Sequence, residues 1–171
     1  MNDFIQHIEI VIFPLVITNT LHMLVVKRSW LGFLDIPISE NLFGKNKTWR
    51  GFVFITCMNS LIVYVLFNLF AFNVSSPLLL GAILGFTYPL FELPNSFLKR
   101  KIGIRPGEQH QKWGYFFMLL DKSDSAFGVC FVYWLLGNVD FCPGSLLFFI
   151  CSAAHIIFSL ILVRLKIKSS F

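Results

Sequence analysis

Long apolar stretches alternate with short polar ones along the chain. The apolar stretches cover residues 4–26, 51–73, 77–98, 125–141 and 144–165. A helix that crosses a bilayer needs roughly 20 apolar residues, and a backbone surrounded by lipid must satisfy its own hydrogen bonds. The pattern therefore predicts an all-α membrane protein, a bundle of about five transmembrane helices that forms one integral-membrane domain over residues 1–171.

Positively charged residues are confined to one side of this predicted bundle. All 14 Lys and Arg residues fall in the first polar segment, in the third polar segment with the start of the helix after it, or in the C-terminal tail. Cytoplasmic loops of membrane proteins collect Lys and Arg. We therefore expect the N-terminus outside an inner or plasma membrane, the C-terminus in the cytoplasm, and cytoplasmic loops at about residues 27–50 and 99–124.

The composition limits the partners that suit these loops. The chain is 56% apolar and 13% charged, with a net charge of +5, so five spans leave no room for a separate soluble domain. A basic cytoplasmic face suits lipid phosphates, nucleotides or the anionic leaflet itself. We expect membrane lipid as a partner and no nucleic acid, and the sequence leaves open whether the chain forms homo-oligomers.

The first cytoplasmic loop ends in a candidate anion site. Lys47 and Arg50 are three residues apart, with Thr48 between them and Gly51 directly after. If a helix begins here, the two cations share one face, and the free N–H groups of the helix N-terminus strengthen the attraction for a phosphate. A solvated cluster that reflects only the positive-inside bias explains these residue types equally well.

A second cluster lies at the end of the third apolar stretch. Ser96 precedes Lys99 by three residues and Arg100 by four, so a hydroxyl and two cations share one helical face. Asn95 and Lys101 stand beside them. The alternative is a helix end whose long cationic side chains merely extend to the membrane surface.

The same region contains features that are costly within a membrane. Glu92 places a charge in an apolar stretch, and Pro94 is expected to break the helix just after it. Both are tolerated where they face a polar cavity. A turn from Gly103 to Gly107 follows the cations.

Two carboxylates form the third candidate group. Asp121 and Asp124 stand at i and i+3, at the expected start of the fourth apolar helix, so one helical face carries both. Mg²⁺ is commonly held by one or two carboxylates together with phosphate oxygens of a substrate. Capping of the helix by Asp121 is the alternative. Because capping leaves Asp124 unexplained, we favour the metal.

Together the three groups contain what phosphoryl-type transfer requires. Such catalysis depends on positioning and on neutralising phosphate charge, which cations and Mg²⁺ supply. The candidate phosphate-binding residues are four cations and two hydrogen-bonding side chains: Lys47, Arg50, Lys99, Arg100, Asn95 and Ser96. No convincing Ser-His-Asp or Cys-His set is present, and His110 is interpreted as a surface residue. A direct transfer without a covalent intermediate is therefore expected.

The three groups resemble the motifs of a known family. Lys47-Thr48-Trp49-Arg50-Gly51, the segment from Ser96 to Gly107, and Asp121-x-x-Asp124 are similar to elements of the CDP-archaeol synthase family, which is related to phosphatidate cytidylyltransferase. The resemblance covers nearly the whole chain. It implies five transmembrane helices with a polar cavity open to the cytoplasm. It also implies Mg²⁺-dependent transfer of CMP from CTP to an anionic lipid phosphate, archaetidate-like or phosphatidate-like, with release of pyrophosphate.

The resemblance also implies roles for individual residues. It assigns catalysis to Lys47, Arg50, Ser96, Lys99 and Arg100, substrate binding to Thr48, Gly51, Glu92, Asn95, Lys101, Gly103 and Gly107, and metal binding to Asp121 and Asp124. The chain departs from the family pattern at Phe91-Glu92, where Gly-Asp is usual, and at Lys122, where Gln is common. These departures leave the acceptor lipid open.

Two other classes of protein are compatible with the same residues. A small transporter or channel subunit could use Glu92 and the expected break at Pro94 to line a substrate path. A non-catalytic membrane protein could use its basic loops only to bind anionic lipid. The first alternative predicts flux without turnover of CTP, and the second predicts that Asp121 and Asp124 are dispensable.

Overall fold

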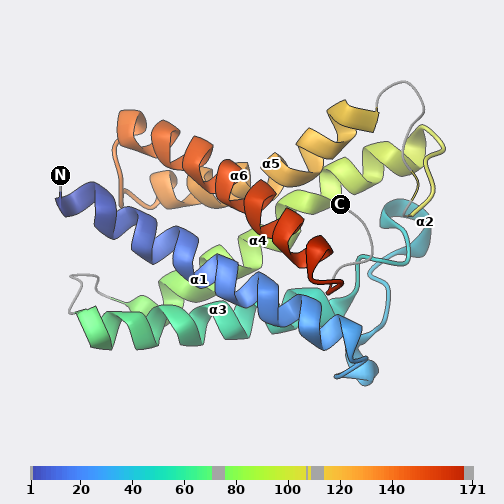
Figure 1. Ribbon diagram of the computed structural model, residues 1–171, viewed down its shortest axis with the longest axis horizontal. Coiled ribbons are helices and arrows are strands. Elements are labelled where there is room, and N and C mark those ends of the chain that lie inside the picture. The colour runs from blue at the N-terminus through green and yellow to red at the C-terminus, as the bar shows by residue number, and fades with distance from the viewer. Residues whose placement is uncertain (1, 71–75, 107, 109–113, 168–171) are drawn as a thin grey trace.

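The computed structural model describes residues 2–70, 76–106, 108 and 114–167. In these residues every regular element is helical, apart from one isolated antiparallel bridge between Pro37 and Thr48. The elements in chain order are α1 (Asn2–Lys27), η1 (Gly32–Leu34), α2 (Glu40–Phe43), α3 (Trp49–Phe70), α4 (Pro77–Lys101), α5 (Gly114–Leu135) and α6 (Phe141–Arg164). Figure 1 shows the five long helices side by side, with α2 at one end.

Four of the described helices are long and apolar enough to cross a membrane. They are Phe4–Lys27 of α1, α3, α4 and α6. Side chains such as Phe13, Leu69 and Phe149 are more than half exposed on these helices, which is the arrangement expected where lipid rather than water covers the surface. The prediction of an all-α membrane protein is confirmed.

The predicted bounds of the fourth apolar helix are wrong. The pattern placed that helix at 125–141, whereas α5 runs over Gly114–Leu135. Hydropathy falls at Asp121, Lys122 and Asp124, and the pattern took this fall for the start of the helix. Helical backbone hydrogen bonds do not depend on the polarity of the side chains, so the helix continues through the charged residues. The two aspartates therefore lie in the middle of the helix and not at its start. This position also rules out the alternative in which Asp121 caps the helix.

The predicted break of α4 at Pro94 is wrong as well. The helix continues through Pro89 and Pro94 and ends at Lys101. A proline removes one backbone hydrogen bond, but membrane helices tolerate it because neighbouring groups and small local adjustments satisfy the freed carbonyl. Glu92, Ser96 and Lys99 consequently lie on one continuous helix, and the loop after it is shorter than predicted.

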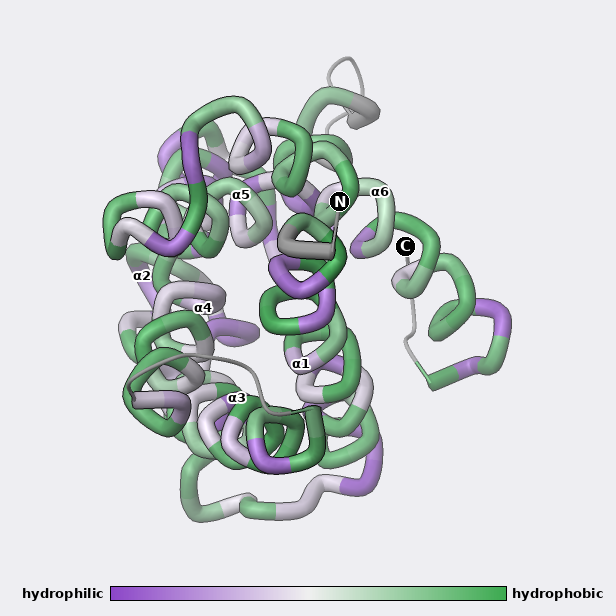
Figure 2. The backbone as a smooth tube through the Cα atoms, turned by 90° about the vertical axis from the view of Figure 1, so that its left-hand side faces the viewer, coloured by the Kyte–Doolittle hydropathy of each residue, from purple (hydrophilic) through white to green (hydrophobic). Residues whose placement is uncertain are grey.

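The five long helices pack as a ring. Each neighbours the next in the order α1, α3, α4, α5, α6, and α6 returns to contact α1. Figure 2 shows this arrangement nearly end-on. The apolar core between the helices includes Val11, Leu84, Val129, Tyr133 and Leu147, which are at most 1% exposed. The ring holds the polar ends of α1, α3 and α4 and the charged middle of α5 around a common space.

Helices α3 and α4 approach each other closely because small residues lie at their contact. A Cβ atom on Gly81 would stand 2.7 Å from Ser60 Cα, and one on Gly85 would stand 2.8 Å from Asn59 Cβ. Asn59 donates a hydrogen bond to the Gly81 carbonyl at 2.8 Å, and Ser60 donates to the Leu78 carbonyl at 2.7 Å. Small residues four apart and polar side chains that bond a neighbouring helix are typical of membrane helix contacts.

Replacement of Gly85 by Leu is expected to destabilise the protein, because the new side chain meets the backbone of α3. Overpacking of this kind costs roughly 1–3 kcal/mol. Thermal unfolding of purified protein in detergent measures the loss. The matched control is Gly32→Ala, since a Cβ at Gly32 has no neighbour within 4 Å. Equal melting temperatures for the two variants would contradict the close α3–α4 contact.

Candidate active site

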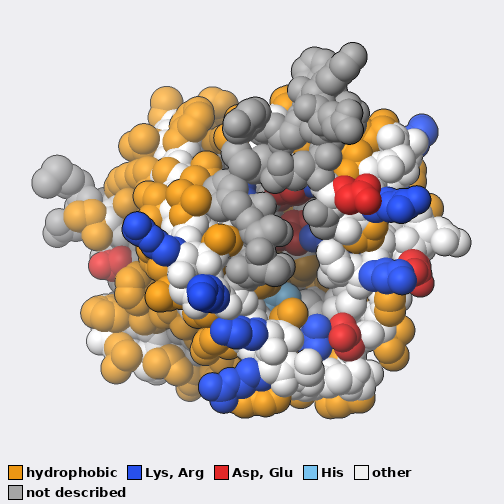
Figure 3. All heavy atoms as spheres, turned by 45° about the vertical axis from the view of Figure 1, so that its right-hand side comes forward, with side chains coloured by type: hydrophobic (Ala, Val, Ile, Leu, Met, Phe, Trp, Pro, Cys, Tyr) orange, Lys and Arg blue, Asp and Glu red, His pale blue; other side chains and the backbone are white. Residues whose placement is uncertain are grey.

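A large cavity opens at the end of the bundle where α1 ends and α3 begins. It measures about 970 Å³, and side chains from all five long helices and the segments between them line it. Among the described residues, nine Lys or Arg and five Asp or Glu side chains contribute to the lining. In Figure 3, cationic side chains surround a hollow within which acidic and histidine side chains are visible. The excess of cations suits an anionic ligand.

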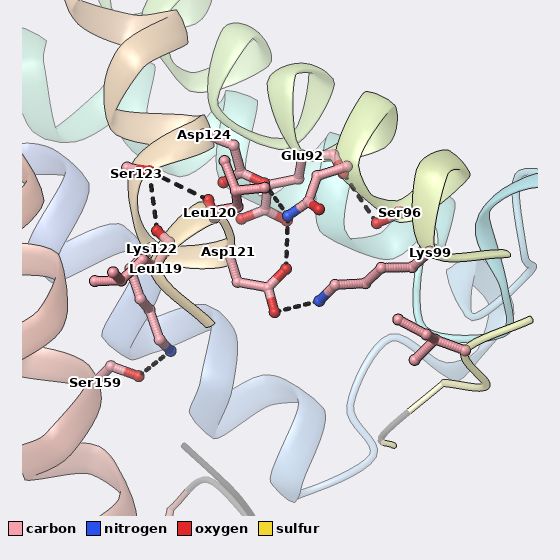
Figure 4. Close-up of polar contacts among 12 residues, drawn as sticks. Glu92, Ser96, Lys99, Leu119, Leu120, Asp121, Lys122, Ser123, Asp124 and Ser159 are labelled. Carbon is pink, nitrogen blue, oxygen red and sulfur yellow. Dashed lines mark hydrogen bonds and ion pairs between the residues drawn. The ribbon is translucent and has the colours of Figure 1, made fainter. Parts of the chain in front are cut away.

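Asp121 and Asp124 on α5 are held toward one point by a single side chain of α4. The amide nitrogen of Asn95 donates to Asp121 Oδ1 at 2.7 Å and to Asp124 Oδ2 at 3.1 Å (Figure 4). Asp124 Oδ1 also accepts from the backbone N–H of Ser125 at 2.6 Å. The buried Asn95 therefore brings both carboxylates together across the α4–α5 contact.

The two carboxylates supply oxygen atoms of the kind that Mg²⁺ takes as ligands. Besides the two carboxylates, Asn95 Oδ1 is buried and has no hydrogen-bond partner among the described residues. Mg²⁺ takes oxygen ligands and is usually held by one or two carboxylates, waters and substrate phosphates. The described part of the chain has no group of three or more His, Cys, Asp or Glu residues that could hold a metal. A metal here would thus need further oxygens from water or from a substrate.

Two lysines of the cavity pair with acids on other segments. Lys99 on α4 forms an ion pair with Asp121 on α5 (Figure 4). Lys47, just before α3, forms an ion pair with Glu92 on α4, and both of these side chains are largely buried. Each pair joins segments that are distant in sequence, so the cations of the site are held in place before any anion binds.

The ionisation of Lys47 follows from these neighbours. Burial alone would lower the pKa of its ammonium group, but the adjacent Glu92 carboxylate opposes this effect, and Asp124 and Asp121 add to the opposition. The pKa of Lys47 therefore lies above its ordinary value. Lys47 remains a cation at neutral pH and can meet a phosphate oxygen.

Arg50, in the first turn of α3, is held by the loop that precedes the helix. Its guanidinium pairs with Asp35 at 3.1 Å and donates to the Trp30 carbonyl at 3.4 Å. The side chain is 6% exposed, and its Nε is buried without a partner in the described residues. Arg50 lines the cavity, so the first loop fixes one of the cations at the candidate site.

Arg100 lies against a glycine that makes room for it. A Cβ on Gly44 would stand 3.1 Å from Arg100 Nε, and Gly44 also has a positive φ of 87°. Arg100 donates to the carbonyl of Ile104, which follows the end of α4. These contacts orient the arginine along the wall of the cavity.

The structure brings most of the predicted site residues together and leaves others apart. The cavity is lined by Lys47, Thr48, Arg50, Gly51, Glu92, Ser96, Lys99, Arg100, Asp121 and Asp124, and Asn95 bonds both aspartates. Lys101 is exposed outside the cavity, and Gly103 has a positive φ of 81° in the turn after α4, away from the lining. Gly107 and His110 lie outside the described residues.

Several residues at the cavity were not predicted from the sequence as part of the site. Tyr88 on α4 and His155 on α6 form a hydrogen bond of 3.0 Å, and His155 Nδ1 lies 3.0 Å from the Lys122 carbonyl, to which it donates. The buried Lys122 ammonium donates to Ser159 at 2.7 Å. His22 of α1 lines the same cavity. The available signal was a polar residue within an apolar helix, which is costly in lipid and often marks a functional interior.

Comparisons with models of known protein families, with curated proteins and with solved structures found no match. The functional interpretation of the cavity therefore depends on its geometry and on the motifs quoted above.

If Asp121 and Asp124 hold Mg²⁺, the metal should stabilise the folded protein. A ligand at 100 times its Kd adds about 2.7 kcal/mol. We expect a higher melting temperature with Mg²⁺ for the wild type and for Asp140→Asn, whose carboxylate precedes α6 and does not line the cavity. Asp124→Asn should lose the increase. An equal increase in Asp124→Asn would show that Mg²⁺ binds elsewhere.

Proposed function

We propose that the protein is a Mg²⁺-dependent integral-membrane cytidylyltransferase, which transfers CMP from CTP to an anionic lipid phosphate and releases pyrophosphate. One observation carries this proposal. The three groups of the motif resemblance, which are far apart in sequence, meet in one cation-rich cavity, where a single amide holds two carboxylates. Phosphoryl-type transfer needs this combination of positioned cations and a metal site.

The proposed topology has five membrane spans, with α5 as the span that the apolar criterion alone does not select. Asp121 and Lys122 of this helix line the cavity, as does Asp124, so its charges avoid lipid. The one-sided distribution of Lys and Arg supports an N-terminus outside and a C-terminus in the cytoplasm. The cavity then opens to the cytoplasm, where CTP is available.

The cations of the cavity bind and orient the two anionic substrates. A lipid phosphate is already an anion near neutral pH, so its oxygen attacks the α-phosphorus of CTP without a general base. The new bond joins this oxygen to the α-phosphorus, and the bond from the α-phosphorus to the bridging oxygen of the β-phosphate breaks. Lys47, Arg50, Lys99 and Arg100 are positioned to neutralise the phosphate oxygens in this step.

The acids of the cavity hold the catalytic groups before the substrates arrive. Glu92 and Asp121 keep Lys47 and Lys99 in place, and Asn95 keeps the two aspartates oriented. When bound by these aspartates, Mg²⁺ would supply neutralisation of charge on the triphosphate and on the leaving pyrophosphate. Because these groups are fixed in advance, little reorganisation is needed at the moment of reaction.

The test is turnover by purified protein in lipid vesicles. CTP, Mg²⁺ and a panel of lipid phosphates that differ in backbone and chains should yield pyrophosphate and a CDP-lipid with at least one acceptor. Asp124→Asn serves as the inactive control. Absence of pyrophosphate with every acceptor, from protein that remains folded, would overturn the proposal, and solute flux in the same vesicles would indicate a transporter instead.

Arg50→Lys and Arg100→Lys should each lower kcat/KM by roughly tenfold or more, because a lysine cannot reproduce the planar, two-pronged hydrogen bonding of arginine to phosphate. Arg164→Lys is the control, since Arg164 ends α6 and does not line the cavity. The rate of pyrophosphate release measures the effect. Unchanged rates in both variants would limit the two arginines to setting topology.

A further inference from the structure

A group of apolar side chains stands exposed in the loop between α1 and the start of α3. Trp30 is 55% exposed, Phe33 73% and Ile36 59%. The short helix η1 within this loop has no buried residue. In Figure 1 the segment projects sideways from the end of α1 and α3, at the lower right. We name residues 28–36 the aromatic loop.

The backbone of the aromatic loop adopts an uncommon conformation that presents these side chains. Ser29 and Leu31 have positive φ values of 53° and 56°. This left-handed region costs a residue other than glycine roughly 1–3 kcal/mol, and proteins retain it where the surroundings compensate. The Trp30 N–H still bonds the Val25 carbonyl at the end of α1, at 3.0 Å. The chain thus turns sharply out of the helix and directs the loop away from the bundle.

The loop begins where a candidate membrane span ends. It directly follows Lys27, the last residue of a candidate membrane span, and the Arg28 guanidinium stands 5.3 Å from the centre of the Trp30 ring. Lysine and arginine beside a membrane span attract anionic headgroups. Tryptophan is enriched at the same level, because its ring is apolar and its N–H is polar.

We infer that the aromatic loop docks into the surface of the membrane leaflet that surrounds this end of the bundle. Trp30, Phe33 and Ile36 enter the boundary between headgroups and acyl chains, and Arg28 meets lipid phosphates. The occupant of this surface is the bilayer itself, because the exposed patch is continuous with the lipid-facing end of α1 and its cations match anionic headgroups. Trp30, Phe33 and Ile36 do not line the cavity, so the inference does not depend on which reaction the cavity performs.

The docked loop also reaches the cavity through one arginine. The Trp30 carbonyl and the Asp35 carboxylate both contact the Arg50 guanidinium, and Asp35 lies between Phe33 and Ile36 in the sequence. The side of the loop that contacts the membrane is thus opposite the side that contacts Arg50. Membrane contact therefore fixes the segment that holds this cation at the cavity.

The depth of Trp30 tests the inference without any catalytic turnover, so its outcome is independent of the proposed cytidylyltransferase activity. The chain has four tryptophans, and the substitutions Trp49→Phe, Trp113→Phe and Trp134→Phe leave Trp30 as the single reporter. The protein is placed in vesicles of phosphatidylcholine and phosphatidylglycerol whose acyl chains carry bromine at a shallow or a deep position. We expect blue-shifted emission, stronger quenching by shallow than by deep bromine, and weak quenching by aqueous acrylamide.

Two results would overturn the inference. Emission at the wavelength of water-exposed indole, quenched by acrylamide but not by bromine, would place the loop in solvent. Shielding from both quenchers would mean that protein covers it, from another copy or another part of the chain.

Variants of the loop provide a second measurement with a matched control. Phe33→Asp in the single-tryptophan protein should move the loop out of the membrane surface, so that quenching by acrylamide rises and quenching by shallow bromine falls. Glu40→Gln changes an exposed acid in neighbouring α2 that pairs only with Lys45 in the described residues, and it should leave both values unchanged. Identical quenching in the two variants would contradict the docking. The measurement on Trp30 without either substitution stands even if Phe33→Asp does not fold.

Discussion

Charged side chains carried by apolar helices must be paired or solvated, because an isolated charge in a low-dielectric surrounding is costly. This requirement shapes the cavity. Glu92 on α4 pairs with Lys47 from the first loop, and Asp121 on α5 pairs with Lys99 on α4. Each pair joins segments separated in sequence. The need to neutralise charge thus draws the first loop, α4 and α5 around one space, and the same pairs hold the groups that an anionic substrate would meet.

Apolar packing decides which charges can reach each other. The close approach of α3 to α4 at Gly81 and Gly85 places the start of α3 beside the end of α4. Lys47 precedes α3 by two residues and Glu92 lies in the last part of α4, so their contact depends on this approach. Larger residues at the two glycines would separate the helices, and the ion pair would lose its geometry although neither partner had changed.

The sequence predicted α1, α3, α4 and α6 to within a few residues, because bilayer thickness sets the length of an apolar helix. It misplaced the start of α5 and predicted a break at Pro94 that α4 does not have, since a fall in hydropathy or a proline was taken for the boundary of a helix. The i, i+3 spacing of Asp121 and Asp124 still predicted a shared face, because that depends only on helical geometry. The contact between Tyr88 and His155 could not be predicted from the sequence, since it depends on how α4 and α6 pack.

The charge of the cavity bears on the proposed reaction as a whole. Among the described residues, nine cationic and five acidic side chains line it, an excess of four positive charges. CTP carries about four negative charges near neutral pH, Mg²⁺ removes two, and a lipid phosphate monoester adds about 1.5 to 2. The complete set of reactants thus carries about −3.5 to −4. A nucleotide–metal complex alone carries about −2 and would leave part of this formal excess unmatched, so the lining charge suits the proposed site, in which both anions are held at once.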